Sequence, residues 1–250
     1  PAAAIGVTGD YLKRAKALVA SGAQILCIDV AHGHHAMMKS ALGKLKAEFE
    51  NHVHLMAGNA GTLEGLNALA EWGADSVRCG IGGGSICSTR LVTGHGVPTL
   101  QNIIDCARTH HDVKIIADGG IKKSGDIVKA LAAGADFVMV GSMFAGTTET
   151  PGQVFTSQSG KKYKVYRGMA SKDAQTDWRG KSSTPEGIST TVAFKGSAKH
   201  VLQDLAGGIK SGLSYTGARN LLELRTKAQF IKQTNAGQAE SFTHILMRNK

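Results

Sequence analysis

A glycine-rich loop that carries a thiol is the stretch of this sequence best suited to chemistry. Residues 80–90 read GIGGGSICSTR, and the glycines let the backbone turn sharply and approach a ligand closely. Ser85 offers a hydroxyl, Cys87 a sulfur that is nucleophilic as the thiolate, and Thr89 a second hydroxyl. The preceding residues, ADSVRC at 74–79, are typical of a short strand. We therefore predict a reactive site at the end of this strand; a turn beside an ordinary buried cysteine is the alternative.

Short apolar segments alternate with helix-forming segments through the first two thirds of the chain. Strands are predicted at 2–7, 25–30, 54–58, 76–80, 113–117 and 137–140, and helices at 10–20, 35–49, 63–72, 100–109 and 126–133. Most of the strands are continuous apolar runs, as strands buried on both faces of a parallel sheet are. The repeat of strand and helix predicts an α/β fold.

Polar or glycine residues stand just past these strands, at Asp29, Asn59, Gly80, Asp118 and Gly141-Ser142. A (β/α)8 barrel carries its active site at the carboxyl ends of its strands. A doubly wound sheet would place a ligand at one switch point rather than after every strand. We therefore predict a TIM barrel, of which this chain holds six strands, the third to the eighth, and we expect the first two upstream of Pro1.

The pattern changes after Thr147. Residues 155–166 predict a β-hairpin with its turn at 158–160, residues 168–187 are polar and loop-like, residues 198–222 are mostly helical, and the last twenty residues are irregular. No second domain is indicated. We interpret residues 1–250 as one catalytic barrel domain with a long insertion before its final helix.

Composition narrows the class of protein and of partner. The 250 residues suffice for one large α/β domain, no apolar run reaches the ~18 residues of a membrane span, and no signal peptide opens the chain. The net charge is +10, but the lysines and arginines are scattered along the chain and only 5% of residues are aromatic. A phosphorylated small substrate is therefore favoured over a nucleic acid. Cysteines without zinc-site spacing predict the cytoplasm or a reducing organelle.

Residues 80–90 resemble the catalytic loop of the IMP dehydrogenase and GMP reductase family. The pattern of that family continues with ADGGI at 117–121, VGS at 140–142, YRGM at 166–169, EG at 186–187, residues 212–229, and AGQAES at 236–241. The resemblance covers essentially the whole chain. It implies a (β/α)8 barrel that begins two strands earlier, often with a CBS module inserted before the third strand, where this chain starts.

The resemblance gives the thiol a chemical role. Cys87 would attack C2 of a purine nucleotide, GMP or IMP, and form a covalent adduct, while Thr89 and Glu186 would move protons. From spacing alone Glu186 could equally be a solvated loop carboxylate. The match of residues 185–187, PEG, to the family favours the catalytic role.

The residues that bind the nucleotide are predicted partly from their types. Asp118, between a buried strand and two glycines, can accept both ribose hydroxyls or form an Asx turn. Hydroxyls and backbone N–H groups suit one 5′-phosphate. By resemblance alone, Met169 would cover the base. The predicted substrate-binding set is Ser85, Asp118, Gly120, Gly141, Ser142, Tyr166, Gly168 and Met169.

The resemblance alone supplies the sites of a dinucleotide and a cation. The dinucleotide, NADPH or alternatively NAD, would contact Asp29, Asn59, Arg78, Gly80 and Gly82. No GxGxxG follows a strand and opens a helix here, so a Rossmann site is not predicted. Potassium would be held by the backbone carbonyls of Gly82, Gly84 and Cys87, with Glu240 from a neighbouring subunit, in a homotetramer or octamer.

The two activities of the family differ in what happens to the adduct. By the resemblance, a dehydrogenase hydrolyses it with a long mobile flap that carries an Arg-Tyr pair, whereas a reductase protonates departing ammonia and then receives hydride. Residues 170–185, between Met169 and Glu186, form a short segment without an Arg-Tyr pair. NADPH-dependent GMP reductase is therefore predicted. The alternatives are IMP dehydrogenase, which residues 29–34, 146–152 and 240–241 favour, and a catalytically silent nucleotide-binding member.

Overall fold

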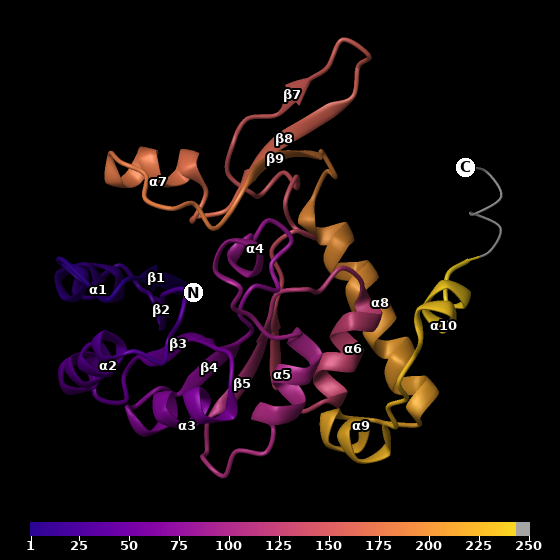
Figure 1. Ribbon diagram of the computed structural model, residues 1–250, viewed down its shortest axis with the longest axis horizontal. Helices are drawn as coiled ribbons and strands as arrows, with labels where there is room; N and C mark the ends of the chain where they lie inside the picture. Colours follow the sequence, from indigo (N-terminus) through magenta and orange to yellow (C-terminus); the bar gives the residue numbers. More distant parts are fainter. Residues whose placement is uncertain (244–250) are drawn as a thin grey trace.

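A six-stranded parallel sheet organises the computed structural model, which describes residues 1–243 (Figure 1). Each strand pairs with the next one along the chain, and the sheet curls into half of a barrel. All six strands lie close to their predicted positions, so the prediction of a partial (β/α)8 barrel is confirmed. The strands are β1 (Ala2–Ile5), β2 (Ile25–Asp29), β3 (His54–Ala60), β4 (Ser76–Cys79), β5 (Lys114–Asp118) and β6 (Phe137–Met139).

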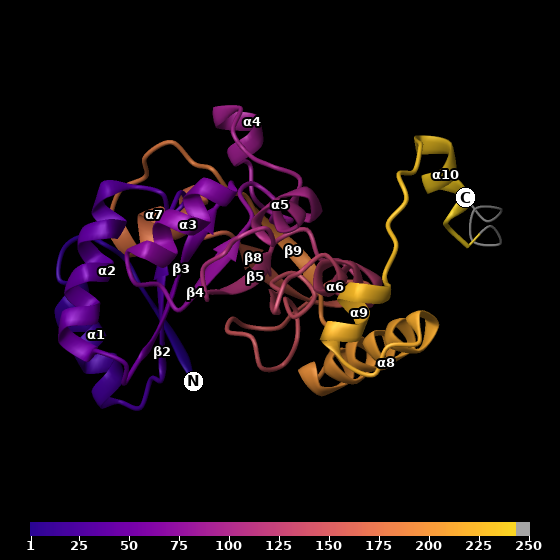
Figure 2. The same cartoon turned by 90° about the horizontal axis from the view of Figure 1, so that it is seen from below.

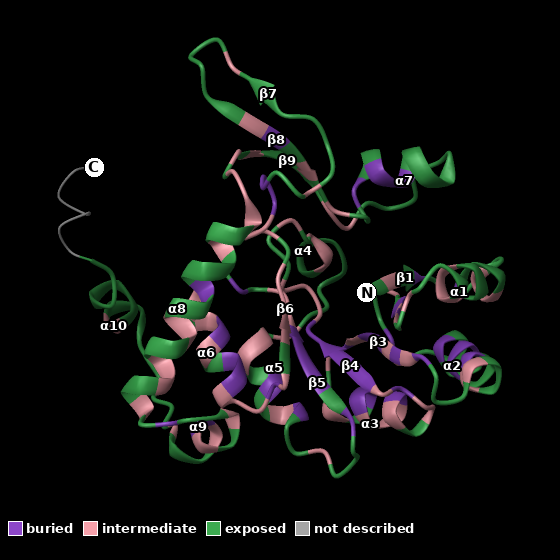
Figure 3. Cartoon of the chain, turned by 180° about the vertical axis from the view of Figure 1, so that it is seen from behind, coloured by how far each residue is buried: buried purple, intermediate pink, exposed green. Residues whose placement is uncertain are grey.

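Helices between the strands form an arc on the outer side of the curled sheet (Figure 2). Four leucines on two of these helices are fully buried, namely Leu42 and Leu45 on the helix after β2, and Leu66 and Leu69 on the helix after β3. The two leucines of each pair are three residues apart, which places both on the same face of the helix. Each such leucine contributes about 1.5–3 kcal/mol by leaving water. Figure 3 shows this burial on β3, β4 and β5 and on the helix faces turned toward them. These helices are α1 (Tyr11–Ala20), α2 (Ala36–Phe49), α3 (Leu63–Glu71), α5 (Thr99–Cys106) and α6 (Ser124–Ala132), whereas the short α4 (Thr89–Thr93) has no buried residue and lies at the end of the sheet (Figure 1).

A long insertion separates β6 from the C-terminal helices and projects from one end of the sheet (Figure 1). The predicted hairpin is confirmed as β7 (Phe155–Thr156) paired with β8 (Lys162–Arg167), and a third antiparallel strand, β9 (Ser189–Ala193), joins β8 on its other side. The buried Lys164 ties this sheet to the preceding loop, because its ammonium donates to the carbonyls of Thr147 at 2.9 Å and Thr150 at 2.5 Å.

The prediction that residues 168–187 form a loop is wrong, because they contain helix α7 (Lys172–Arg179). Ser171 caps its first turn through the N–H of Ala174, and Gly180 ends it in the left-handed region at φ 72°. Both residues are standard helix boundary signals. The helix was not predicted because the segment is mostly polar, and only one side of this short helix is buried.

Within residues 1–243, three helices follow the insertion. The long helix α8 (Ala198–Thr216) packs on α6 so closely that a Cβ at Gly208 would lie 2.1 Å from Ser124 Oγ. Gly217 interrupts the predicted helix 198–222, and α9 (Leu221–Lys227) follows it. The last twenty residues are not all irregular as predicted, because α10 (Asn235–Glu240) lies among them; residues 244–250 fall outside the described part. No helix of residues 1–243 is long and apolar enough to cross a membrane.

Candidate active site

The three predicted catalytic side chains form a hydrogen-bonded chain beyond the end of β4. The Cys87 thiol donates to Thr89 Oγ1 at 3.2 Å, and the Thr89 hydroxyl donates to Glu186 Oε2 at 2.9 Å. Cys87 is exposed, whereas Thr89 and Glu186 are half-buried. A proton can therefore pass between the sulfur and the carboxylate through one hydroxyl, while the sulfur stays accessible to a substrate.

Backbone pairing holds Glu186 beside the catalytic loop, although it lies in the insertion. The N–H of Ser88 donates to the Glu186 carbonyl at 2.9 Å, and the N–H of Ile188 donates to the Ile86 carbonyl at 3.0 Å. On its other side, the Glu186 N–H donates to the Ala170 carbonyl at 3.1 Å. The carboxylate is thus held between two backbone segments instead of standing on an unsupported loop.

Close backbone contact explains why glycines occupy the catalytic loop. A Cβ at Gly80, whose φ is 144°, would lie 2.0 Å from the carbonyl oxygen of Asp118. A Cβ at Gly119, whose φ is 92°, would lie 2.9 Å from the carbonyl carbon of Gly83. Only glycine fits such positions without strain. The loop after β4 therefore lies directly on the loop after β5, which brings Asp118 next to the thiol-bearing segment.

Arg78 is the centre of a charged cluster at the carboxyl ends of four neighbouring strands. Its guanidinium is buried, with 5% of the residue exposed, and it pairs with Asp29 through Nη2 and with Asp118 through Nη1 at 3.4 Å. Asn59 donates to the Asp118 carboxylate at 2.9 Å and to the Gly80 carbonyl at 2.7 Å. The cluster joins the predicted dinucleotide residues to the predicted ribose acceptor.

The environment of Asp118 alters its acidity. Burial raises the pKa of Asp118 above its ordinary value, and the nearby charge of Asp29 adds to this effect. The hydrogen bond from Asn59 and the charge of Arg78 act in the opposite direction on the same pKa. The ionised carboxylate is purely an acceptor, whereas protonation turns one of its oxygens into a donor, and Asp118 makes this change at a higher pH than an aspartate of ordinary pKa does.

The predicted phosphate-binding residues come from four segments, namely the catalytic loop, the turns after β5 and β6, and β8. Tyr166 Oη, from β8, lies 3.3 Å from the point where a Cβ at Gly141 would project, so the insertion reaches back to the end of β6. Gly120 lies beside the catalytic loop, because its Cβ would be 3.7 Å from the Gly83 carbonyl oxygen. Ser85 is exposed within that loop. One of these residues therefore lies in the thiol-bearing segment and another directly beside it, while Tyr166 and Gly141 lie next to each other.

The remaining substrate candidates lie where the insertion meets the sheet. A Cβ at Gly168 would touch the Ile86 side chain at 3.5 Å, so the chain after β8 crosses the catalytic loop here. The next residue, Met169, is 66% exposed, which leaves its side chain available to a ligand. The carbonyl of Ser142 accepts from Lys195 Nζ at 3.1 Å, which fixes the turn after β6.

The residues predicted to hold a cation are only partly close together. Gly82, Gly84 and Cys87 lie in one tight loop, in which the Cys87 N–H donates to the Gly84 carbonyl at 3.2 Å. Glu240 ends α10, which lies apart from α4 and the adjoining catalytic loop in two views (Figures 1 and 2). Within the described residues of one chain, the glutamate and the carbonyls are therefore separate, and the cation site stays a prediction.

A comparison with protein families identifies the family of this chain. The model of the IMP dehydrogenase / GMP reductase domain matches residues 1–244. The chain belongs to the IMP dehydrogenase/GMP reductase family. The resemblance of its motifs is confirmed, and the members of the family are oxidoreductases of purine nucleotide metabolism.

Curated relatives in the family are named inosine-5′-monophosphate dehydrogenase. The chain is 45% identical to the protein of Nitrosopumilus maritimus, with 98% of this chain and 54% of the relative covered. It is 49% identical to the protein of Staphylococcus saprophyticus, with 99% and 53% covered. The chain thus spans about half the length of the curated relatives it matches.

Solved structures of both family activities resemble the chain. A GMP reductase from Trypanosoma brucei, a cysteine-to-alanine variant in complex with guanosine 5′-monophosphate, superposes with a TM-score of 0.92 at 42% identity, covering 97% of this chain and 52% of that one. The inosine 5′-monophosphate dehydrogenase from Legionella pneumophila gives a TM-score of 0.83 at 48% identity, covering 94% and 73%.

Two buried polar side chains that hold the insertion in place were missed by sequence reasoning. Gln175, on α7, is buried and bonded to the segment that carries Glu186. Its helix could have been found from Ser171 and Gly180, which bound it as caps. Lys164 gave no sequence signal, because a lysine within an alternating strand pattern is usually exposed.

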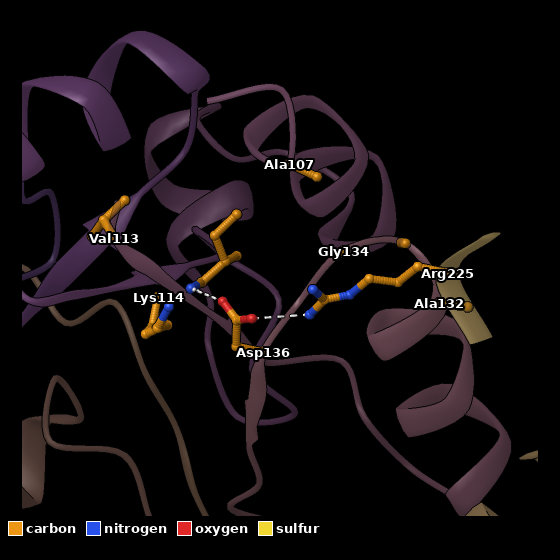
Figure 4. A pocket seen from close by; sticks show the side chains of 9 residues that line it. Ala107, Val113, Lys114, Ala132, Gly134, Asp136 and Arg225 are labelled. Atoms are coloured by element: carbon orange, nitrogen blue, oxygen red, sulfur yellow. Dashed lines mark hydrogen bonds and ion pairs between the residues drawn. The ribbon is translucent and has the colours of Figure 1, made fainter. Parts of the chain in front are cut away.

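One depression lies away from this site, at the opposite end of β5 and β6 (Figure 4). Asp136 spans it, accepting from the Ile115 N–H at 2.8 Å and from Arg225 Nη2 at 3.0 Å. Arg225 also donates to the Ala135 carbonyl at 2.8 Å. These bonds attach α9 to the start of β6, which is a structural function.

Proposed function

We propose that this chain is the catalytic part of a GMP reductase, which converts GMP to IMP and ammonia with NADPH. In this proposal residues 1–250 form the catalytic domain, and the first two barrel strands lie upstream of Pro1. The observation that carries the proposal is the segment between Met169 and Glu186. It is short and contains the helix α7, and the residue that follows it, Glu186, accepts from the Ser88 N–H of the catalytic loop. A reductase needs no mobile flap, and this segment has the length and fold of a fixed one.

The geometry supports a covalent route for this reaction. The thiolate of Cys87 adds to C2 of GMP, and the 2-amino group then leaves as ammonia with a proton that passes through Thr89 from Glu186. When bound, NADPH supplies the hydride that C2 receives as the carbon–sulfur bond breaks. IMP and the free thiolate result, so Cys87 is unchanged after one turnover.

The binding residues hold the nucleotide while C2 reacts. Ionised Asp118 accepts the ribose hydroxyls, and the hydroxyls of Ser85, Ser142 and Tyr166 join backbone N–H groups around the 5′-phosphate. Met169, which is exposed beside the loop, covers the base. These contacts orient C2 toward the sulfur and lower the entropic cost of the attack.

The residue types around Arg78 suit the dinucleotide cosubstrate. Asp29 is 49% exposed at the rim, so its carboxylate can accept hydroxyls of a ligand, whereas Arg78 is enclosed and holds Asp29 in place. For a monovalent cation, carbonyls of Gly82, Gly84 and Cys87 are suitable hard oxygen donors. The partner subunit's Glu240 would complete this site, which makes a homotetramer or octamer part of the proposal.

IMP dehydrogenase is the second candidate, favoured by the names of the curated relatives. That activity needs a base to activate water against the adduct. Residues 170–185 contain no tyrosine, and Arg179 stacks on Trp178 with its guanidinium carbon 4.2 Å from the ring centroid. The reductase requires no such base, which is why we prefer it.

A pair of glutamate variants tests the proposed reductase. Glu186→Gln keeps the shape of the side chain and removes its acidic proton, so ammonia release should slow by about 100-fold or more while GMP affinity changes little. Glu71→Gln, at an exposed position on α3, serves as the control and should retain full rate. A Glu186→Gln variant that releases ammonia as fast as the parent chain would contradict the assigned role.

A further inference from the structure

Gln175 is a buried amide that makes three hydrogen bonds through its side chain but lies outside the predicted site. It is 4% exposed and occupies the inner face of α7. Its Nε2 donates to the Ala170 carbonyl at 3.0 Å, and its Oε1 accepts from both the N–H of Ser183 at 2.8 Å and the hydroxyl of Ser183 at 2.9 Å. One side chain thus connects the start of α7 to the loop after it.

The chemistry of these contacts requires an amide. The Ala170 carbonyl needs a donor, and the Ser183 N–H needs an acceptor, so glutamine supplies both from one side chain. A glutamate could keep the acceptor but not the donor. A methionine of similar size could fill the space and make neither bond.

The bonds of Gln175 lead directly to Glu186. The Ala170 carbonyl that Gln175 binds also accepts the Glu186 N–H, at 3.1 Å. Ser183 lies three residues before Glu186, so both ends of the stretch 183–186 are fixed to α7 and its approach. The Glu186 carbonyl in turn accepts from Ser88, between the thiol and Thr89.

We propose that Gln175 is a positioning residue for the proton relay. It holds residues 183–186 against the catalytic loop, and this keeps the Glu186 carboxylate in contact with Thr89. The role in turnover rests on the proposed function of Glu186, whereas the hold on the loop does not.

Amide hydrogen exchange tests the hold on the loop in the full chain. Gln175→Met should speed exchange at Ser183, Glu186 and Ser88 by about tenfold or more, because the bonds that close the loop are lost. Thr176→Ala, at the neighbouring exposed position of α7, is the matched control and should leave all three amides unchanged. Faster exchange at Ser183 alone would overturn the proposal, since the effect would then stop short of Glu186.

Turnover tests the consequence for chemistry. Gln175→Met should lower kcat for ammonia release by about tenfold, with KM for GMP changed by less than about twofold. Gln175→Glu, which keeps the acceptor, should restore protection at Ser183 but not at Glu186, and it serves as the second variant if the methionine chain unfolds. An unchanged kcat despite a freed loop would refute the positioning role. Failure of the proposed function would show separately, as full turnover in Glu186→Gln.

Discussion

Replacing Arg78 by methionine tests how the strand-end cluster is held together. The substitution keeps an unbranched apolar stem and removes the charge that Asp29 and Asp118 share. Removing one partner of a buried ion pair costs about 3–5 kcal/mol. Asp29 is 49% exposed and can be solvated by water, while Asp118 is 22% exposed and keeps its bond from Asn59. We therefore expect the free energy of unfolding to fall by about 2–3 kcal/mol.

The loss in Arg78→Met should depend on pH in a definite direction. The charge of Arg78 lowers the pKa of Asp118, so without it that pKa rises further above its unfolded value of about 3.9. A carboxyl whose pKa is higher in the folded chain than in the unfolded chain binds its proton more tightly in the folded chain. The penalty is therefore present at neutral pH and disappears as pH falls through the folded pKa toward the unfolded one.

Urea unfolding of four chains measures this effect. The set is the parent chain, Arg78→Met, Asp118→Asn and the double variant, each at about pH 7.5 and about pH 4.5. The double variant should recover most of the loss, because no unpaired charge remains at Asp118. Arg108→Met, whose exposed pair with Asp105 is worth less than about 1 kcal/mol, is the control. Equal losses at both pH values, or additive losses in the double variant, would refute the reasoning.

Three further predictions follow from single contacts. Gly80→Ala should abolish turnover and destabilise the chain in thermal unfolding, because its Cβ would lie 2.0 Å from the Asp118 carbonyl oxygen; Gly43→Ala, where nothing lies within 4 Å, should not. As the solution is acidified, GMP affinity measured by calorimetry should begin to fall at a higher pH than it would if Asp118 had the ordinary aspartate pKa of about 4. Asp118→Asn should remove this pH dependence. Lys164→Met should cost about 1–3 kcal/mol by urea unfolding, because two carbonyls lose their donor; a variant as stable as the parent would show that water replaces the ammonium.

The sheet was predictable because its signals are local. Each strand is a short apolar run, and each helix repeats its apolar residues at helical spacing, as Leu66 and Leu69 do on α3. Glycines marked the catalytic loop, since the contact of Gly80 with Asp118 admits no side chain. These patterns are visible in the residues themselves, before any partner is known.

Other parts of the site depend on contacts between distant segments. Thr89 and Glu186 are in contact because the insertion folds back onto the loop after β4. No local sequence pattern predicts this folding back, so their joint role was expected from the family resemblance alone. Arg78 was predicted to touch a dinucleotide, but its burial between Asp29 and Asp118 appears only when four strands lie side by side. Gln175 was missed because it binds the backbone of Ala170 and the backbone and hydroxyl of Ser183, and such contacts produce no recognisable sequence pattern.

Product analysis in both directions tests the central proposal most directly. Purified chain, together with any upstream segment that completes the barrel, is incubated with GMP and NADPH, and separately with IMP and NAD. We predict that NADPH absorbance falls with GMP, that ammonia appears in equal amount, and that IMP with NAD yields little or no xanthine nucleotide. Steady formation of xanthosine monophosphate from IMP and NAD, without ammonia release from GMP, would contradict the reductase and establish the dehydrogenase.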